Sequence, residues 1–162
     1  MQYEADRTLQ VAVELERLGK TFYESLAAGC GNKEIAALAV KLAKDEENHV
    51  ALFKRMREML PPLHQGPKLT EEELFAASKE LRDKIMPDAA TVRAAVTAAD
   101  PTKALDMAIA MEAHAVSYYT NLALSVKGLD AEILRNFVKE EYEHLNTLRA
   151  RRQRLFSKAA NP

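Results

Sequence analysis

The sequence has little of several residue types, and each scarcity excludes a class of structure. A single cysteine, Cys30, excludes an internal disulfide and any four-cysteine metal site. There is no tryptophan, and only 5 glycines and 6 prolines interrupt the 162 residues. Few helix breakers among many Ala, Leu, Glu and Lys residues favour helix. We therefore expect an all-α protein. We expect Cys30 to be a reduced thiol on the surface or in a loop.

Charge and hydropathy exclude several partners. The formal net charge is −1, which indicates neither nucleic acid nor an anionic membrane as a partner. No apolar run approaches the roughly 20 residues that a membrane-spanning helix needs. The first residues, MQYEADRTLQ, are charged and do not read as a secretory signal. A lone cysteine suits a reducing compartment, so we expect a cytoplasmic protein with no membrane segment.

Helical periodicity runs through four long segments, which are expected at about 4–28, 32–59, 100–126 and 130–157. Asn32 and Asp100 are suited to cap the second and third of them. Only short stops, at 29–31 and 127–129, separate the first from the second and the third from the fourth. Short connections predict antiparallel neighbours, so the segments should form two helical hairpins.

The link between the hairpins, about 60–100, is long. It contains the amphipathic segment TEEELFAASKELRDKI, in which Thr70 and Glu73 form a capping box, and a shorter helical piece, DAATVRAAVTAA. A long crossover between two hairpins is one way to build a four-helix bundle. We predict one domain, residues 1–162, with the fold of an antiparallel four-helix bundle whose hairpins are joined by a partly helical crossover.

The two predicted hairpins repeat one polar pattern. Each contains a Glu, a Tyr seven residues later and then a Glu-x-x-His motif. The residues are Glu16, Tyr23, Glu46 and His49 in the first half and Glu112, Tyr119, Glu141 and His144 in the second. The first and third helices align at an offset of 96 residues, and the second and fourth at 95. One Glu-x-x-His is a weak motif, but two within a matched repeat indicate a duplicated hairpin with a pseudo-twofold axis.

Neighbouring apolar residues place the four Glu and both His of this repeat inside the bundle. Leu42 and Phe53, for example, share a helix face with Glu46 and His49. Four buried carboxylates cannot all stay ionised in an apolar core without compensation. Two divalent metal ions would supply this compensation. The pattern also matches di-iron and di-manganese sites, in which two helices contribute one Glu each and the other two contribute one Glu-x-x-His each. The predicted metal ligands are Glu16, Glu46, His49, Glu112, Glu141 and His144.

Two acidic residues beside the predicted ligands are candidates to orient the histidines. Metal-bound histidine usually gives its other N–H to a carboxylate or a carbonyl. Asp45 would reach His144 of the opposite hairpin, and Glu140 would reach His49. The alternative is that both are solvated charges on helix surfaces.

The two repeated tyrosines, Tyr23 and Tyr119, are the candidate catalytic residues. They lie two turns beyond Glu16 and Glu112. Each either donates a hydrogen bond to a ligand carboxylate across the site or only packs in the core.

A second apolar stripe follows the first and third predicted helices and is too apolar to face solvent. It should face either the crossover segment or a partner subunit. His114, on this stripe, points about 200° away from Glu112, so we expect a packed or interface histidine and not a ligand. The stripe consists of Val11, Leu15, Leu18 and Phe22 with Met107, Met111, His114 and Tyr118.

At these residues the sequence resembles the ferritin-like superfamily, and the rubrerythrin branch most closely. The resemblance covers about 1–60 and 100–157, in the segments VAVELERLGKTFYESLA, LAKDEENHVALFKRM, ALDMAIAMEAHAVSYYTNLA and VKEEYEHLNTL. It implies two iron ions, with manganese as the alternative, bridged by Glu46 and Glu141. It also implies a homodimer that reduces hydrogen peroxide or oxygen, or oxidises ferrous iron with oxygen.

The chain departs from the rubrerythrin pattern in two places. Its single cysteine excludes the cysteine-rich rubredoxin domain of full-length rubrerythrins, so an external electron donor protein is expected. Ala115 stands where rubrerythrins tend to have an extra Glu, which argues against their redox-linked ligand exchange and efficient peroxide reduction.

Three alternatives to a di-iron reductase follow from the same residues. One is a ferroxidase or iron-binding protein with little peroxide turnover, and another is a structural bundle without metal. The third is oxygenation of an organic molecule, which would require an apolar pocket beside the metals.

Overall fold

The computed structural model describes residues 4–85, 88–97, 101–125 and 129–160, and every regular element in these ranges is helical. This confirms the predicted all-α class. The long helices are α1 (Glu4–Gly29), α2 (Lys33–Glu58), α5 (Thr102–Ser125) and α6 (Leu129–Ala160), close to the predicted bounds. The crossover contains η1 (Pro62–His64), α3 (Glu71–Ile85) and α4 (Ala89–Val96).

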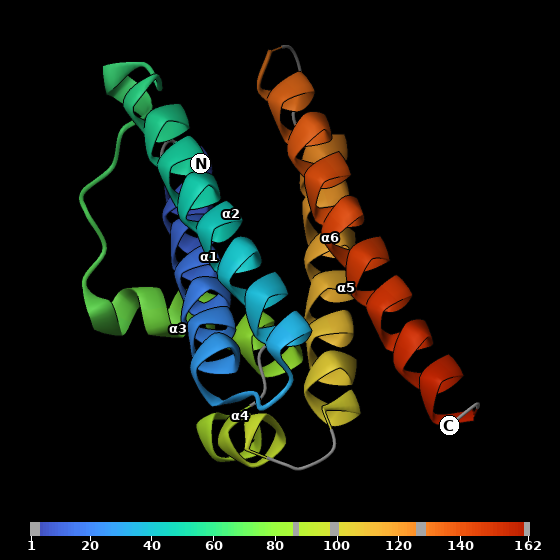
Figure 1. Cartoon of the computed structure of the whole chain (residues 1–162). Helices are drawn as coiled ribbons and strands as arrows, with labels where there is room; N and C mark the ends of the chain where they lie inside the picture. The colour runs from blue at the N-terminus through green and yellow to red at the C-terminus, as the bar shows by residue number, and fades with distance from the viewer. Residues whose placement is uncertain (1–3, 86–87, 98–100, 126–128, 161–162) are drawn as a thin grey trace.

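The long helices pack in two pairs, α1 with α2 and α5 with α6, and α2 also contacts α6 (Figure 1). These contacts are those of a helix bundle. The turn between α1 and α2 follows the predicted chemistry, because the Asn32 side chain accepts hydrogen bonds from the backbone N–H groups of Glu34 and Ile35. The other predicted cap, Asp100, and the predicted stop at 127–129 fall wholly or largely outside the described residues.

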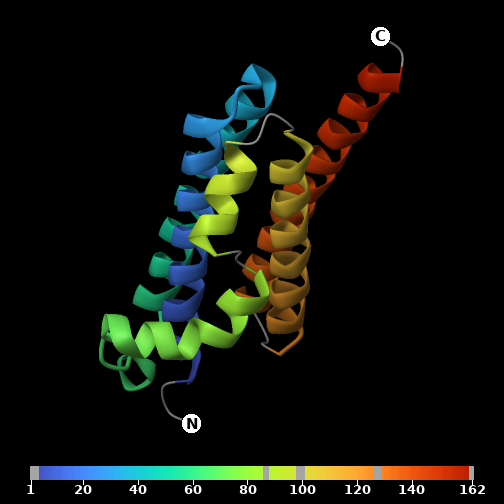
Figure 2. The same ribbon diagram turned by 90° about the horizontal axis from the view of Figure 1, so that it is seen from below.

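The crossover helices α3 and α4 lie against α1 and α5 (Figure 2). The predicted capping box opens α3: the Glu73 backbone N–H donates to Thr70 Oγ1, and the Thr70 backbone N–H donates to Glu73 Oε2 at 2.8 Å. The Asp88 side chain caps α4 by accepting hydrogen bonds from the backbone N–H groups of Ala90 and Thr91. The second apolar stripe is predicted to face either the crossover or a partner subunit. The crossover helices do pack against α1 and α5, the two helices that carry the stripe.

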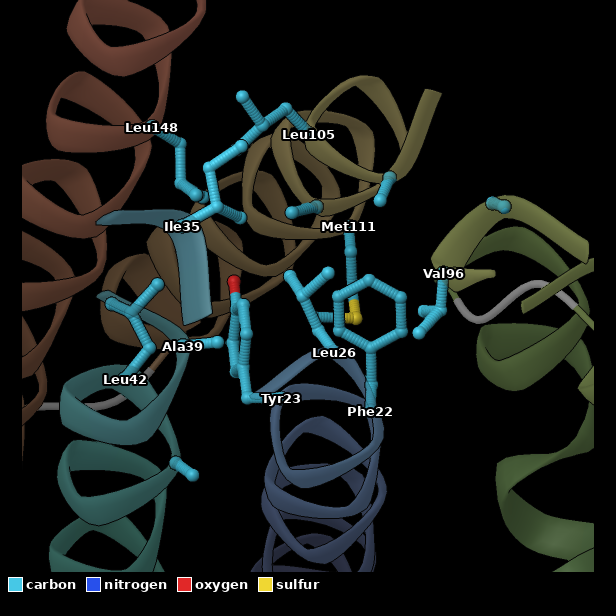
Figure 3. Packing of buried hydrophobic residues seen from close by; sticks show 14 residues of the cluster. Phe22, Tyr23, Leu26, Ile35, Ala39, Leu42, Val96, Leu105, Met111 and Leu148 are labelled. Carbon is cyan, nitrogen blue, oxygen red and sulfur yellow. The ribbon is translucent and has the colours of Figure 1, made fainter. Parts of the chain in front are cut away.

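The stripe is covered only in part. Phe22 and Met111 are buried and pack in one cluster with Val96 of α4 (Figure 3). His114 is exposed, so the prediction of a packed histidine is wrong within this chain. An interface role for His114 stays a prediction.

Two apolar clusters divide the bundle interior, and the repeated Glu and His residues lie between them along each helix. On α2, Leu42 belongs to one cluster and Phe53 to the other. Glu46 and His49 fall between those two residues in the chain. Both clusters draw on α1, α2, α5 and α6, so they fix the four helices above and below the polar layer. No helix in the described ranges is long and apolar enough to span a bilayer.

A partly buried ion pair, which sequence reasoning missed, ties the start of α1 to the end of α2 and to the crossover. Arg57 Nε donates to Asp6 Oδ1 at 2.6 Å, and the Asp6 side chain is 1% exposed. Gln10 Nε2 donates to Asp6 Oδ2 at 2.6 Å, and Gln10 Oε1 accepts from the backbone N–H of Leu69 at 2.8 Å. The same arginine also donates to the Gly66 carbonyl. The network therefore joins three segments through one carboxylate.

We expect Arg57→Ala to lower the free energy of unfolding by about 2–3 kcal/mol, because it leaves the Asp6 carboxylate buried without its cation. The melting temperature should fall by roughly 4–12 °C, measured by far-UV circular dichroism. Arg152, 95 residues later, is the repeat equivalent and pairs with the half-exposed Asp106 on the second hairpin. Arg152→Ala is the matched control and should shift the melting temperature far less. Equal losses in the two variants would contradict the role assigned to burial.

Candidate metal centre

One layer of the bundle contains all six predicted ligands. They come from four helices, and each residue is at most 7% exposed. Helices α1 and α5 contribute one Glu each, and α2 and α6 contribute one Glu-x-x-His each. The structure thus brings the repeated residues together at the centre of the bundle.

The six side chains form two groups, each of which could hold a metal ion. One group is Glu16, Glu46, His49 and Glu141; the other is Glu46, Glu112, Glu141 and His144. Within each group, one potential ligand atom per residue lies within 4.8 Å of the others. Glu46 and Glu141 belong to both groups. Each group therefore has three carboxylates and one imidazole, and two of the carboxylates are shared.

Both histidines turn Nδ1 toward the carboxylates. His49 Nδ1 lies 2.9 Å from Glu141 Oε1 and 3.2 Å from Glu16 Oε2. His144 Nδ1 lies 3.9 Å from Glu141 Oε2 and 4.0 Å from Glu112 Oε1. The inward nitrogen is therefore the one available as a ligand.

The outward nitrogens meet the two acidic residues that the sequence indicated. His49 Nε2 lies 3.4 Å from Glu140 Oε2, and His144 Nε2 lies 3.4 Å from Asp45 Oδ2. Both predicted pairs are confirmed, and each joins one hairpin to the other. A carboxylate that accepts the Nε2 proton leaves the Nδ1 lone pair free for a metal.

The tyrosines cross between the hairpins in the same symmetric way. Tyr23 OH donates to Glu112 Oε1, and Tyr119 OH donates to Glu16 Oε1. Both hydroxyls are buried, and each holds one oxygen of a carboxylate from the opposite hairpin. Of the two predicted alternatives, the hydrogen bond across the site is the one observed. A catalytic role for either tyrosine stays a prediction.

Electrostatics in the layer favour bound protons or cations. Burial raises the pKa of Glu46 well above its usual range, and the nearby charges of Glu16 and Glu141 raise it further. Burial likewise raises the pKa of Glu112 and of Glu141. His49 is also buried, which would lower its pKa, but the close carboxylates of Glu141, Glu16 and Glu46 outweigh burial and raise the pKa.

Glu16 differs from the other three carboxylates. Burial raises its pKa, but its contacts with His49, Glu46 and Tyr119 outweigh burial, so the net direction is downward. The layer therefore has one carboxylate that ionises readily and three that resist ionisation unless a cation is present.

Two buried atoms of the layer, Glu141 Oε1 and His144 Nδ1, have no hydrogen-bond partner. His49 Nδ1 lies close to Glu141 Oε1 but shares its hydrogen-bonding capacity with Glu16. An unpaired buried polar atom costs about 1–3 kcal/mol, so native proteins rarely keep one without a reason. Glu141 belongs to both groups and His144 to the second, so metal ions bound in the two groups would satisfy both atoms. The donor set of carboxylate oxygen and imidazole nitrogen fits iron or manganese.

A small cavity of about 20 Å³ borders the carboxylates where α1 and α5 approach the layer. Besides the carboxylates, it is lined by Leu15, Gly19, Met111, Ala115 and Tyr119. Sequence reasoning noted Ala115 only as a missing Glu and did not single out Gly19. The repeat could have found Gly19, since it aligns with Ala115 at the same offset of 96 residues that aligns the two halves.

Comparisons of the chain with family models, with curated proteins and with solved structures find no match. The function is therefore argued from the geometry of the site.

Proposed function

We propose that the protein is a di-iron oxidoreductase of the rubrerythrin type, with a ferritin-like helix arrangement. It would reduce hydrogen peroxide or oxygen with electrons from an external donor protein. The observation that carries the proposal is the pair of four-residue groups that share Glu46 and Glu141. Di-iron carboxylate bundles use the same donor set: two shared carboxylates, and for each ion one further carboxylate and one imidazole.

In this proposal Glu16 and His49 hold one ion and Glu112 and His144 hold the other. Glu46 and Glu141 contribute to both. When bound, two adjacent iron ions supply the two electrons that reduction of one O–O bond requires. Reduction of hydrogen peroxide consumes two electrons and two protons and yields two water molecules.

The chain's own residues orient the ligands. Glu140 lies 3.4 Å from His49 Nε2 and Asp45 lies 3.4 Å from His144 Nε2, so each carboxylate is placed to accept the Nε2 proton and to keep Nδ1 inward. Tyr23 and Tyr119 hold one oxygen each of Glu112 and Glu16. The surrounding apolar clusters keep bulk water away from the layer. Manganese fits the same donor set, and the homodimer and the cytoplasmic location stay predictions.

The alternatives are separated by particular features of the layer. A cavity of about 20 Å³ has room only for a small molecule, which favours peroxide or oxygen over an organic substrate. Four buried carboxylates and the unpaired, buried Nδ1 of His144 disfavour a structural bundle without metal. A ferroxidase would use the same six residues, so only an assay separates it from a peroxide reductase.

The test loads purified protein with Fe(II) without oxygen and then adds peroxide together with an iron–sulfur electron carrier and its reductase. We expect about two iron ions per chain and continued peroxide consumption, with two electrons used per peroxide. The metal-free protein is the control. Uptake of iron with a single oxidation event and no turnover would favour the ferroxidase, and no uptake would favour the structural bundle.

A further inference from the structure

Gly19 is an unexpected residue for its place in the fold. It is buried in the interior of α1, a helix of 26 residues, and its backbone does not have a positive φ. Glycine in a helix interior is markedly less favourable than alanine. Since the backbone conformation does not require glycine here, the reason lies in what a side chain would contact.

A side chain at position 19 would meet Glu46. A Cβ atom built there lies 3.1 Å from Glu46 Cδ and 3.2 Å from Glu46 Oε1, closer than the 3.5–4.0 Å of an ordinary contact. The three nearest heavy atoms all belong to the Glu46 carboxyl group, and none belongs to the α2 backbone. The closest contact of a side chain at position 19 would therefore be with the Glu46 carboxyl group and not with the α2 backbone. Gly19 leaves room for one of the two shared carboxylates.

The repeat places a second small residue opposite. Ala115 follows Glu112 by three residues, as Gly19 follows Glu16. Both residues line the cavity of about 20 Å³, together with both shared carboxylates, Glu46 and Glu141. The cavity thus exists because both pseudo-equivalent positions have little or no side chain.

We propose that Gly19 and Ala115 form a size-selecting pocket that admits a small ligand of two or three heavy atoms to the shared carboxylates. Gly19 is also a positioning residue, since it lets Glu46 take the place needed to serve both ions. The inference rests on the proposed function and assigns to these two residues the size limit on its substrate. Larger peroxides with organic groups would be excluded.

Two variants test the two positions separately. Gly19→Ala should weaken Fe(II) binding at least tenfold, whereas the metal-free variant should melt at or above the wild-type temperature because alanine favours helix. Ala115→Leu should keep two iron ions per chain but fill the cavity. Its ferric form should bind azide, a three-atom probe, at least tenfold more weakly, as measured by the azide-to-iron absorption band.

Gly31→Ala is the matched control, because a Cβ at position 31 meets nothing within 4 Å. It should leave iron and azide binding unchanged. Wild-type iron binding in Gly19→Ala, or wild-type azide affinity in Ala115→Leu, would overturn this inference and leave the proposed function standing. If the metal-free Gly19→Ala protein is itself less stable than the metal-free wild type, Gly19 has a packing role. That result would also overturn this inference. A wild-type protein that takes up no iron would overturn the proposed function itself, and the pocket with it.

Discussion

The double variant Glu46→Gln/Glu141→Gln is expected to bind almost no iron and to keep its helical fold. These two residues belong to both four-residue groups, so their loss leaves each group with one carboxylate and one imidazole. Glutamine has nearly the size of glutamate, so the apolar clusters on either side should still pack. Iron content after anaerobic loading should fall from about two per chain to near zero.

Iron should also stabilise the wild-type protein and not the double variant. A ligand that binds only the folded state at a thousand times its dissociation constant adds about 4 kcal/mol to the free energy of unfolding. For a chain of this size that corresponds to a rise in melting temperature of roughly 8–16 °C. Glu47→Gln is the control, since Glu47 is next to Glu46 but exposed and paired with Lys20 and Lys44. Retained iron in the double variant, or its loss in the control, would contradict the assignment of the shared carboxylates.

The helices could be predicted from the sequence because their signals are local. Asn32 caps α2 and Thr70 with Glu73 caps α3 through contacts within three residues, which the sequence displays directly. The polar layer could also be predicted, because a period of three to four residues places Glu46 and His49 on one face of α2. Repetition of that pattern on α6 then indicated that two helices meet there.

Features that depend on distant contacts could not be predicted. The pair of Asp6 and Arg57 is separated by 51 residues and has no local pattern that sets it apart from a surface pair. Exposure of His114 also depends on which faces of α5 the other helices cover, and periodicity does not specify this. The contact of Gly19 with Glu46 joins α1 to α2, and only the structure shows that a missing side chain is what matters there.

A second large effect is expected from pH. The metal-free protein should lose stability as the pH rises above about 6.5, whereas the iron-loaded protein should not. His49 has a raised pKa in the folded state, so above its ordinary value of 6.5 the folded protein holds a proton that the unfolded chain releases. The stabilisation from His49 is complete below that pH and is lost progressively as the pH rises.

The carboxylates act in the same direction. Glu46, Glu112 and Glu141 have raised pKa values, so above the ordinary value of 4.5 their ionisation is less favourable in the folded state than in the unfolded chain. The free energy of unfolding therefore falls as the pH rises above 4.5 as well. Glu16, with a lowered pKa, acts only below 4.5, where its contribution is lost as the pH falls. Above pH 6.5 no group in the layer with a shifted pKa opposes the loss.

When the folded protein holds one proton more than the unfolded chain, the free energy of unfolding falls by about 1.4 kcal/mol per pH unit. Two pH units therefore lower it by about 3 kcal/mol. The melting temperature of the metal-free protein should fall by roughly 6–12 °C between about pH 6.5 and 8.5. Bound metal ions replace these protons, so the gap between iron-loaded and metal-free protein should widen with pH. The Glu46→Gln/Glu141→Gln variant removes two of the carboxylates beside His49, and its melting curve should depend less on pH. Parallel pH profiles for the loaded and metal-free proteins would mean that the buried layer does not exchange protons for metal.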